Sequence, residues 1–284
     1  MPAFHLNTPI DHVGFVTKDL AQLERLYRRL GFHLAPRQPL NTSSDVNQAP
    51  QEVGQHSAHI IFQQGYLELT AVQGTAPDMH LTPYLGRPDG VQIVAIRTDS
   101  ASDAHGQMHH MDLPPSDLAI SSRTIAYGTG GEARFSWFML SPSEFPEALL
   151  CWVEHLTPEL VYQPEVMSHP NGVLRLKEVL MTVEPFAELQ PRYAKLDNQA
   201  NLARASVMPS LTLLSIDEIE RRFTSVRARQ TNGVSGLILE VDDLAHTIEV
   251  LQQQDIAVYG DNKRGVWISS EDAGGVILSF QSAF

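Results

Sequence analysis

Apolar and polar positions along this chain repeat in one order: a strand pattern, an amphipathic helix pattern and three further strand patterns. The first strand covers 10–17 and is mostly apolar or β-branched. Apolar residues at helical spacing predict a helix over 19–30, and Gly31 behind them is typical of a helix C-terminal cap. This unit is completed by short strand patterns near 32–36, 58–63 and 65–72.

The same β-α-β-β-β order begins three more times. The second, third and fourth units start with strand patterns at 92–98, 176–183 and 236–241, followed by helix patterns over 100–111, 185–195 and 243–254. Later strands are clear in the second and fourth units, at 121–127, 133–140, 148–156, 256–259, 265–269 and 275–281. The third unit offers only 211–216, so we predict that it is degenerate.

Each unit carries strands that cannot bury their faces alone, so neighbouring units should pair. We predict an α+β protein of four βαβββ modules in two paired half-barrel domains, with the helices outside. Between the second and third units, regular structure is interrupted by Pro164, His169, Pro170, Asn171 and Gly172. The predicted boundary therefore separates an N-terminal domain, 1–168, from a C-terminal domain, 169–284.

Composition narrows the class of protein. The chain has 284 residues, of which 43% are hydrophobic and 19% charged, as in ordinary globular proteins. The net charge of −13 argues against a nucleic-acid binder. No apolar run approaches the length of a membrane span, and the N-terminus lacks the pattern of a signal peptide. Together with a single cysteine, Cys151, this predicts a cytoplasmic protein with no membrane partner.

Two polar residues stand where a strand normally presents an apolar side chain. His12 lies within the first strand, and Glu68 lies within the strand that closes the first unit. An unpaired buried charge costs several kcal/mol or shifts its pKa. The two residues should therefore stabilise each other, most simply by sharing a metal ion.

The repeat resembles the vicinal oxygen chelate superfamily, which includes glyoxalase I, bleomycin-resistance proteins and extradiol dioxygenases. The first module carries this likeness best: Ile10-Asp11-His12-Val13-Gly14-Phe15 opens it, and Gly65-Tyr66-Leu67-Glu68-Leu69 closes it. The segments His155-Leu156-Thr157-Pro158-Glu159-Leu160 and His169-Pro170-Asn171-Gly172 look like a glyoxalase-like branch of that superfamily.

The resemblance implies metal ligands on the first and last strands of paired modules. His12 and Glu68 fall on those positions in module one, whereas the matching first-strand residue of module two is Ile93, which cannot ligate. Aligning the last strands puts His155 opposite Glu68, and a shift by one residue selects Glu154 instead; only one of the two can face inward. We favour His12, Glu68 and His155 as ligands of a divalent cation such as Fe, Mn or Zn.

A metal-free cavity, in which His12 and Glu68 simply hydrogen-bond each other, is the alternative. The C-terminal modules place no histidine at either start, which argues against the extradiol arrangement there and favours a structural or dimerising role. Other candidates for substrate contact, each with an equally simple structural explanation, are His56, His59, Tyr66, Arg123, Trp137 and His169. An inward Arg123 would clamp a carboxylate, whereas an outward one would be solvated.

Two functions follow. The first is a metal-dependent enzyme that chelates vicinal oxygens of a small substrate, with Glu68 or Glu154 as the base; lyase, isomerase and dioxygenase outcomes all remain open. The second is a metal-free protein that sequesters a ligand, as bleomycin-resistance proteins do, between Tyr66, Trp137 and Trp152. Either way the partner is a small molecule, and a homodimer is possible.

Overall fold

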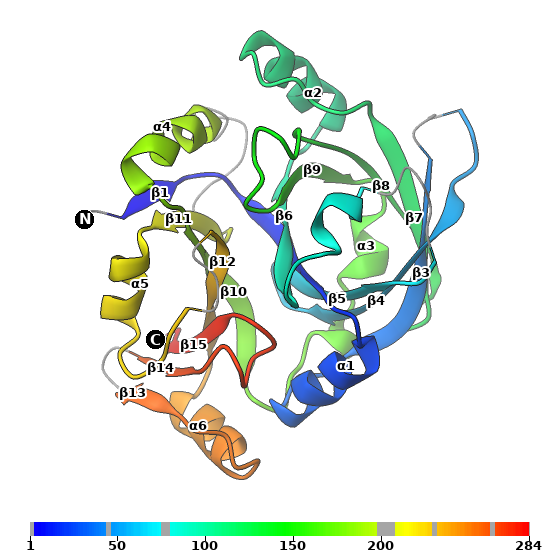
Figure 1. Ribbon diagram of the computed structural model, residues 1–284. Coiled ribbons are helices and arrows are strands. Elements are labelled where there is room, and N and C mark those ends of the chain that lie inside the picture. Colours follow the sequence, from blue (N-terminus) through cyan, green and yellow to red (C-terminus); the bar gives the residue numbers. More distant parts are fainter. Residues whose placement is uncertain are drawn as a thin grey trace.

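The computed structural model describes residues 3–43, 47–74, 80–197, 208–228, 232–261 and 265–283, and it contains two sheets packed side by side (Figure 1). One is a closed barrel with the strand order β2-β5-β4-β3-β7-β8-β9-β6. Its strands are β2 (Ile10–Val16), β3 (Ala35–Ser43), β4 (Gln51–Ile61), β5 (Tyr66–Val72), β6 (Gly90–Arg97), β7 (Ala119–Ile125), β8 (Gly131–Met139) and β9 (Leu149–His155).

The barrel is made of modules one and two. Each contributes four neighbouring strands, and the modules meet at two antiparallel seams, β2 against β6 and β3 against β7. Within each module the first strand runs parallel to the last, as β2 does to β5 and β6 does to β9. The paired-module fold predicted from the repeat is therefore confirmed.

The second sheet is open and has the order β1-β11-β10-β12-β15-β14-β13. Its strands are β1 (Phe4–Leu6), β10 (Val173–Thr182), β11 (Ser210–Leu214), β12 (Gly233–Val241), β13 (Tyr259–Asp261), β14 (Gly265–Ile268) and β15 (Ile277–Ser282). Module four supplies β12 to β15 in the same arrangement as a barrel module. Among the described residues, module three supplies β10 and its parallel partner β11 and no other strand, which confirms that it is degenerate.

The N-terminal strand completes the degenerate module. β1 pairs antiparallel with β11, just as β4 pairs antiparallel with β5 in module one. β1 therefore lies in the second sheet, within the range 1–168 that the prediction gave to the N-terminal domain, and the chain reaches the barrel at Ile10. Leu6 anchors β1 in the core with 1% of its surface exposed.

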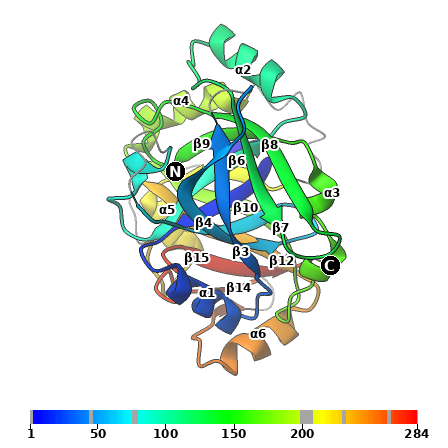
Figure 2. The same ribbon diagram turned by 90° about the vertical axis from the view of Figure 1, so that its right-hand side faces the viewer.

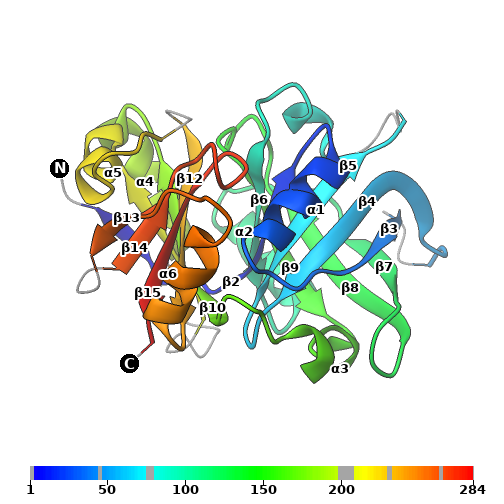
Figure 3. The same cartoon turned by 90° about the horizontal axis from the view of Figure 1, so that it is seen from below.

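Helices cover the outer faces of both sheets (Figures 2 and 3). The predicted helices are present as α1 (Leu20–Arg29), α2 (Ala101–His110), α4 (Phe186–Asp197) and α6 (Leu244–Gln252). The pattern did not predict the shorter α3 (Pro158–Val161) and α5 (Ile216–Arg222), nor the 3₁₀ turns Thr82–Tyr84 and Pro164–Val166. Among the described residues, no helix is both long and apolar enough to cross a membrane.

Helix α1 shows how local sequence sets an element. Asp19 accepts a hydrogen bond from the Gln22 amide at the N-terminus, and Gly31 follows the C-terminus with φ of +83°, which favours glycine. The hydroxyl of Tyr27 donates to the carbonyl of Ala273 in module four, so α1 packs between the two halves of the molecule.

The main core lies between the sheets. Val13 on β2 and Val94 on β6 point out of the barrel and join one apolar cluster with Leu176 on β10 and Leu237 on β12. All seven residues of β2 are consequently buried, because one face meets this core and the other faces the barrel interior. This double burial explains why a polar residue on β2 must find a partner.

Candidate functional site

The site begins at a shift of register in β2. Ile10 pairs with Ile96 and His12 pairs with Ala95, so two steps along β2 match one step along β6. Such a bulge re-aims side chains by breaking strand alternation. Asp11 is the extra residue, and its carboxylate lies on the same side as the His12 ring: Oδ2 is 2.8 Å from Nδ1 of His12 and 2.9 Å from Nε2 of His155.

Asp11 is fully buried and ionised. Burial alone would raise the pKa of its carboxyl group, but the charges and hydrogen bonds of His155 and His12 outweigh burial and hold the pKa well below its usual range. A carboxylate only accepts hydrogen bonds, so Nδ1 of His12 and Nε2 of His155 both donate to it. Arg97 adds a positively charged neighbour, with Nη1 3.5 Å from Oδ1.

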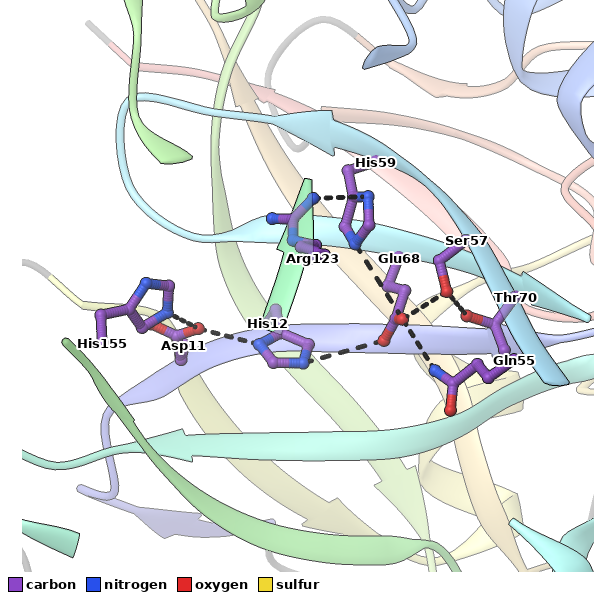
Figure 4. Close-up of polar contacts among 9 residues, drawn as sticks. All are labelled: Asp11, His12, Gln55, Ser57, His59, Glu68, Thr70, Arg123 and His155. Carbon is purple, nitrogen blue, oxygen red and sulfur yellow. Dashed lines mark hydrogen bonds and ion pairs between the residues drawn. The ribbon is translucent and has the colours of Figure 1, made fainter. Parts of the chain in front are cut away.

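Glu68 faces His12 from the neighbouring strand β5 of the same module. One carboxylate oxygen, Oε1, accepts hydrogen bonds from Nε2 of Gln55 at 3.0 Å and from Oγ of Ser57 at 2.7 Å. The other, Oε2, lies 3.9 Å from Nε2 of His12. His155, Asp11, His12 and Glu68 therefore form one row of polar contacts (Figure 4).

The ring of Tyr66 fixes the plane of His12. The two rings stack with centroids 4.2 Å apart and an interplanar angle of 12°. With Nδ1 bound to Asp11 and one ring face covered by Tyr66, His12 presents Nε2 toward Glu68. This backing of a histidine by a buried carboxylate is common to catalytic and metal-binding histidines.

A second polar cluster lies on the opposite side of Glu68. Nη1 of Arg123 donates to Nδ1 of His59 at 2.8 Å, so the His59 proton sits on Nε2, which is 4.0 Å from Oε1 of Glu68. Burial, together with the positive charges of Arg123 and His12, lowers the pKa of His59 well below its ordinary value. His59 is therefore neutral, and Figure 4 shows it between Arg123 and Glu68.

These groups line a cavity that is partly open to solvent. The polar wall comes from β2, β4, β5 and β7. The facing wall is apolar and consists of Ile93, Phe135, Trp137, Leu149, Cys151 and Val153.

Six of the residues singled out in the sequence line the cavity: His12, His59, Tyr66, Glu68, Arg123 and Trp137. Sequence reasoning missed Asp11, Gln55, Ser57 and His80. His80 packs edge-on against Trp137, and burial, only partly offset by Glu68, lowers its pKa to about 4. Asp11 lies inside the strand pattern and motif that marked His12, but strict strand alternation placed it on the opposite face. Gln55, Ser57 and His80 are ordinary polar residues that no motif marks.

Other candidates lie away from the cavity. Glu154 accepts a hydrogen bond from the amide of Ala101 and so caps α2 on the outside of the barrel. His56 lies 3.4 Å from Glu52 and is partly exposed. Trp152 stacks on Phe138 within the outer core.

His169 is held by backbone groups. Its Nδ1 accepts from the amide of His33 and its Nε2 donates to the carbonyl of Ile61, at 3.2 Å and 3.0 Å. It connects the segment between modules two and three to the turn after α1 and to β4. His169 is not among the residues that line the cavity.

The register of the barrel identifies the positions related by the pseudo-twofold axis. His12 pairs with Ala95 and Gly14 with Ile93, so the axis relates His12 to Ile93, as the sequence indicated. Glu68 pairs with Gly14, and Cys151 pairs with Ala95. Cys151 therefore occupies the position that the sequence alignment gave to His155. Burial, followed by Glu68 and Asp11, raises the pKa of its thiol, which stays protonated.

His155 does turn inward, but it points at Asp11. Its side chain is 1% exposed, and its Nδ1 is buried without a hydrogen-bond partner among the described residues. Across the described part of the chain, no group of three or more His, Cys, Asp or Glu side chains is placed to hold a metal ion. In this arrangement His12, Glu68 and His155 do not form a three-ligand centre.

Paired βαβββ modules with a cavity inside the first pair define a protein of the vicinal oxygen chelate superfamily. The family model of the Glyoxalase-like domain matches residues 10–196, more than half of the chain, and the protein belongs to that family. No curated protein sequence matches the chain.

Solved structures share the fold at low sequence identity. A hypothetical protein from Staphylococcus aureus is 9% identical with a TM-score of 0.61, covering 96% of this chain and 98% of that one. A mutant of 4-hydroxymandelate synthase from Streptomyces coelicolor is 14% identical with a TM-score of 0.58, covering 98% and 93%. A xylose isomerase-like TIM barrel/4-hydroxyphenylpyruvate dioxygenase fusion protein is 13% identical with a TM-score of 0.52, covering 99% of this chain and 50% of its own.

The substitution Asp11→Asn tests the shared carboxylate. The amide carries no negative charge, so the two buried ring N–H groups of His12 and His155 lose the charged acceptor that they face. We expect the free energy of unfolding at pH 7 to fall by about 3 kcal/mol or more in urea titrations. The exposed Asp117→Asn should change it by less than about 0.5 kcal/mol. Equal, small effects of both substitutions would contradict the role given to Asp11.

The buried His169 predicts a pH-dependent stability. Burial, partly offset by the hydrogen bond to Ile61, lowers its pKa from 6.5 to about 4. Between those values the unfolded chain binds more protons than the folded chain, so the free energy of unfolding falls as the pH falls. The amide of His169→Gln can keep both hydrogen bonds without titrating.

We therefore expect the free energy of unfolding of wild type to fall relative to that of His169→Gln from pH 6.5 down to pH 4, as measured by urea unfolding at each pH. The exposed His110→Gln is the matched control and should follow the wild-type curve throughout. Parallel curves for wild type and His169→Gln would show that His169 does not titrate in this window.

Proposed function

We propose that the barrel cavity is the active site of a glyoxalase-like enzyme that moves a proton on a small carbonyl-bearing substrate. One observation carries this proposal: Oε2 of Glu68 and Nε2 of His12 face each other 3.9 Å apart in the cavity, each held from behind by buried partners. A base and an acid held in this way are what proton abstraction next to a carbonyl requires.

Glu68 is suited to act as the base. Gln55 and Ser57 hold Oε1, which leaves Oε2 directed at the cavity. In the proposed step, Oε2 takes a proton from the carbon next to the substrate carbonyl, and the electron pair moves onto the carbonyl oxygen. The protonated Glu68 then returns the proton to carbon, so the step needs no oxidant or co-reactant.

His12 is suited to stabilise the oxygen that gains charge. Asp11 holds the Nδ1 proton, and in the proposed step a proton on Nε2 of His12 is donated to the developing oxyanion. A preorganised donor of this kind acts most strongly in a cavity with one apolar wall. Asp11 serves as a positioning residue, because it acts through His12.

The resemblance implies a divalent cation that would polarise substrate oxygens. The described donors offer it the facing pair of His12 and Glu68, and the two symmetry-related positions hold Ile93 and Cys151. The proposed step is therefore assigned to side chains alone.

A second candidate is a protein that binds a ligand without converting it. The apolar wall that includes Phe135 and Trp137 favours it, because such a surface holds the carbon skeleton of a planar ligand. Tight binding without any proton exchange would distinguish this function from the enzyme.

Proton exchange in D₂O tests the enzyme directly. Wild type is incubated with a panel of small 2-oxo and 2-hydroxy compounds, and loss of the adjacent C–H signal is followed by ¹H NMR. We expect exchange with at least one compound, and a loss of roughly 100-fold or more in Glu68→Gln and in His12→Gln. The exposed Glu132→Gln should exchange at the wild-type rate. Exchange that survives both site substitutions would refute the proposed roles.

Elemental analysis tests the cation. Wild type, His12→Ala and the exposed control His110→Ala are incubated with Fe(II), Mn(II) and Zn(II) and then dialysed. We expect no stoichiometric metal in any of them, because two facing donors hold a cation poorly. Stoichiometric metal in wild type and His110→Ala that is lost in His12→Ala would instead make His12 a metal ligand.

A further inference from the structure

We infer that the molecule bound in the barrel is a carboxylic acid with an apolar body and a hydroxyl or N–H group. This inference rests on the proposed function, since it names the substrate class of the same site. Two residues that line the cavity each have one buried polar atom without a partner among the described residues: Nη2 of Arg123, a donor, and Oε1 of Gln55, an acceptor. Buried polar atoms without partners are rare, and each calls for an explanation.

Arg123 needs an anion. Its guanidinium is charged at any physiological pH, yet the residue is 4% exposed and forms no ion pair with a carboxylate in the described part of the chain. Its surroundings are the neutral His59 and the rings of Tyr66 and Phe135, each about 5.7 Å from the guanidinium carbon.

The rings offset part of the positive charge, but they leave the Nη2 hydrogens unbound. A neutral carbonyl would satisfy the donor without the charge, whereas a carboxylate satisfies both.

Gln55 needs a donor. Its amide orientation is fixed, because Nε2 donates to Oε1 of Glu68 and a carboxylate can only accept. Oε1 of Gln55 therefore turns away from Glu68 as an acceptor, on a residue that is 1% exposed. A hydroxyl or N–H of the bound molecule is the group that completes it.

The rest of the cavity selects against other anions. The apolar wall offers no donors to a phosphate or sulfate, and a dianion would bring a second negative charge beside the carboxylate of Glu68. Phe135, Leu149 and Val153 instead match a carbon skeleton. A monoanionic carboxylate with one polar substituent fits all of these features.

Calorimetric titration with benzoate, benzamide and the three hydroxybenzoates tests the inference. We expect benzoate to bind wild type at least tenfold more tightly than benzamide, and at least one hydroxybenzoate to bind more tightly than benzoate. This comparison of ligands uses only the wild-type protein, so it does not depend on how a variant folds. Equal binding of benzoate and benzamide, or binding of neither, would overturn the inference.

Two substitutions assign the contacts. Arg123→Met should weaken benzoate binding at least tenfold, while Arg134→Met, which removes an exposed arginine from the adjacent strand β8, should leave it unchanged. Gln55→Met should abolish the preference for hydroxybenzoate over benzoate. Benzoate affinity at the wild-type level in a folded Arg123→Met would place the carboxylate elsewhere and refute the assignment.

The failure of this inference can be told apart from the failure of the proposed enzyme. Benzoate binding that depends on Arg123, without any proton exchange in D₂O, would remove the enzyme and keep the carboxylate site. Proton exchange that depends on Glu68, with benzamide binding as well as benzoate, would keep the enzyme and remove the carboxylate.

Discussion

The site depends on the hydrogen bonds that the buried carboxylate of Asp11 accepts. Asp11 accepts from His12 and His155 and lies beside Arg97, so it links β2, β6 and β9 at the seam between the two modules of the barrel. A charge at that depth is tolerated only because three positive or donating groups surround it. The same bonds determine that His12 shows Nε2, and not Nδ1, to Glu68. Asp11, which binds the far side of the His12 ring, therefore determines which nitrogen of His12 faces the cavity.

The remaining polar wall follows a similar rule. Each group that faces the cavity is held by another that does not react: Gln55 and Ser57 hold Glu68, Tyr66 covers His12, and Arg123 sets the tautomer of His59. The facing wall is apolar. Polar groups thus position a bound molecule from one side, and packing confines it from the other.

The sequence was sufficient to predict the four modules and to single out His12 and Glu68. Helical and strand periodicity identified the four units, and His12 and Glu68 stood out because strands buried on both faces seldom carry them. It was not sufficient for Asp11, because strict alternation puts neighbours on opposite faces and the bulge depends on pairing with β6. Likewise, the pairing between strands makes Cys151 the equivalent of Glu68. Aligning the residues of the two last strands by local sequence similarity had selected His155 instead. The side toward which Arg123 turns was open in the sequence and is decided by packing against Tyr66 and Phe135.

The N-terminal strand has a consequence for dividing the molecule. β1 pairs with β11 at one edge of the second sheet, and among the described residues module three places no further strand beside β11. A fragment without β1 would therefore expose the backbone edge of β11, and such edges invite pairing with other chains. β1 precedes the barrel in the sequence and its partner β11 follows it, so the two halves of the molecule are interlocked. A split version of this protein would need Phe4–Leu6 supplied to the C-terminal piece as a separate strand.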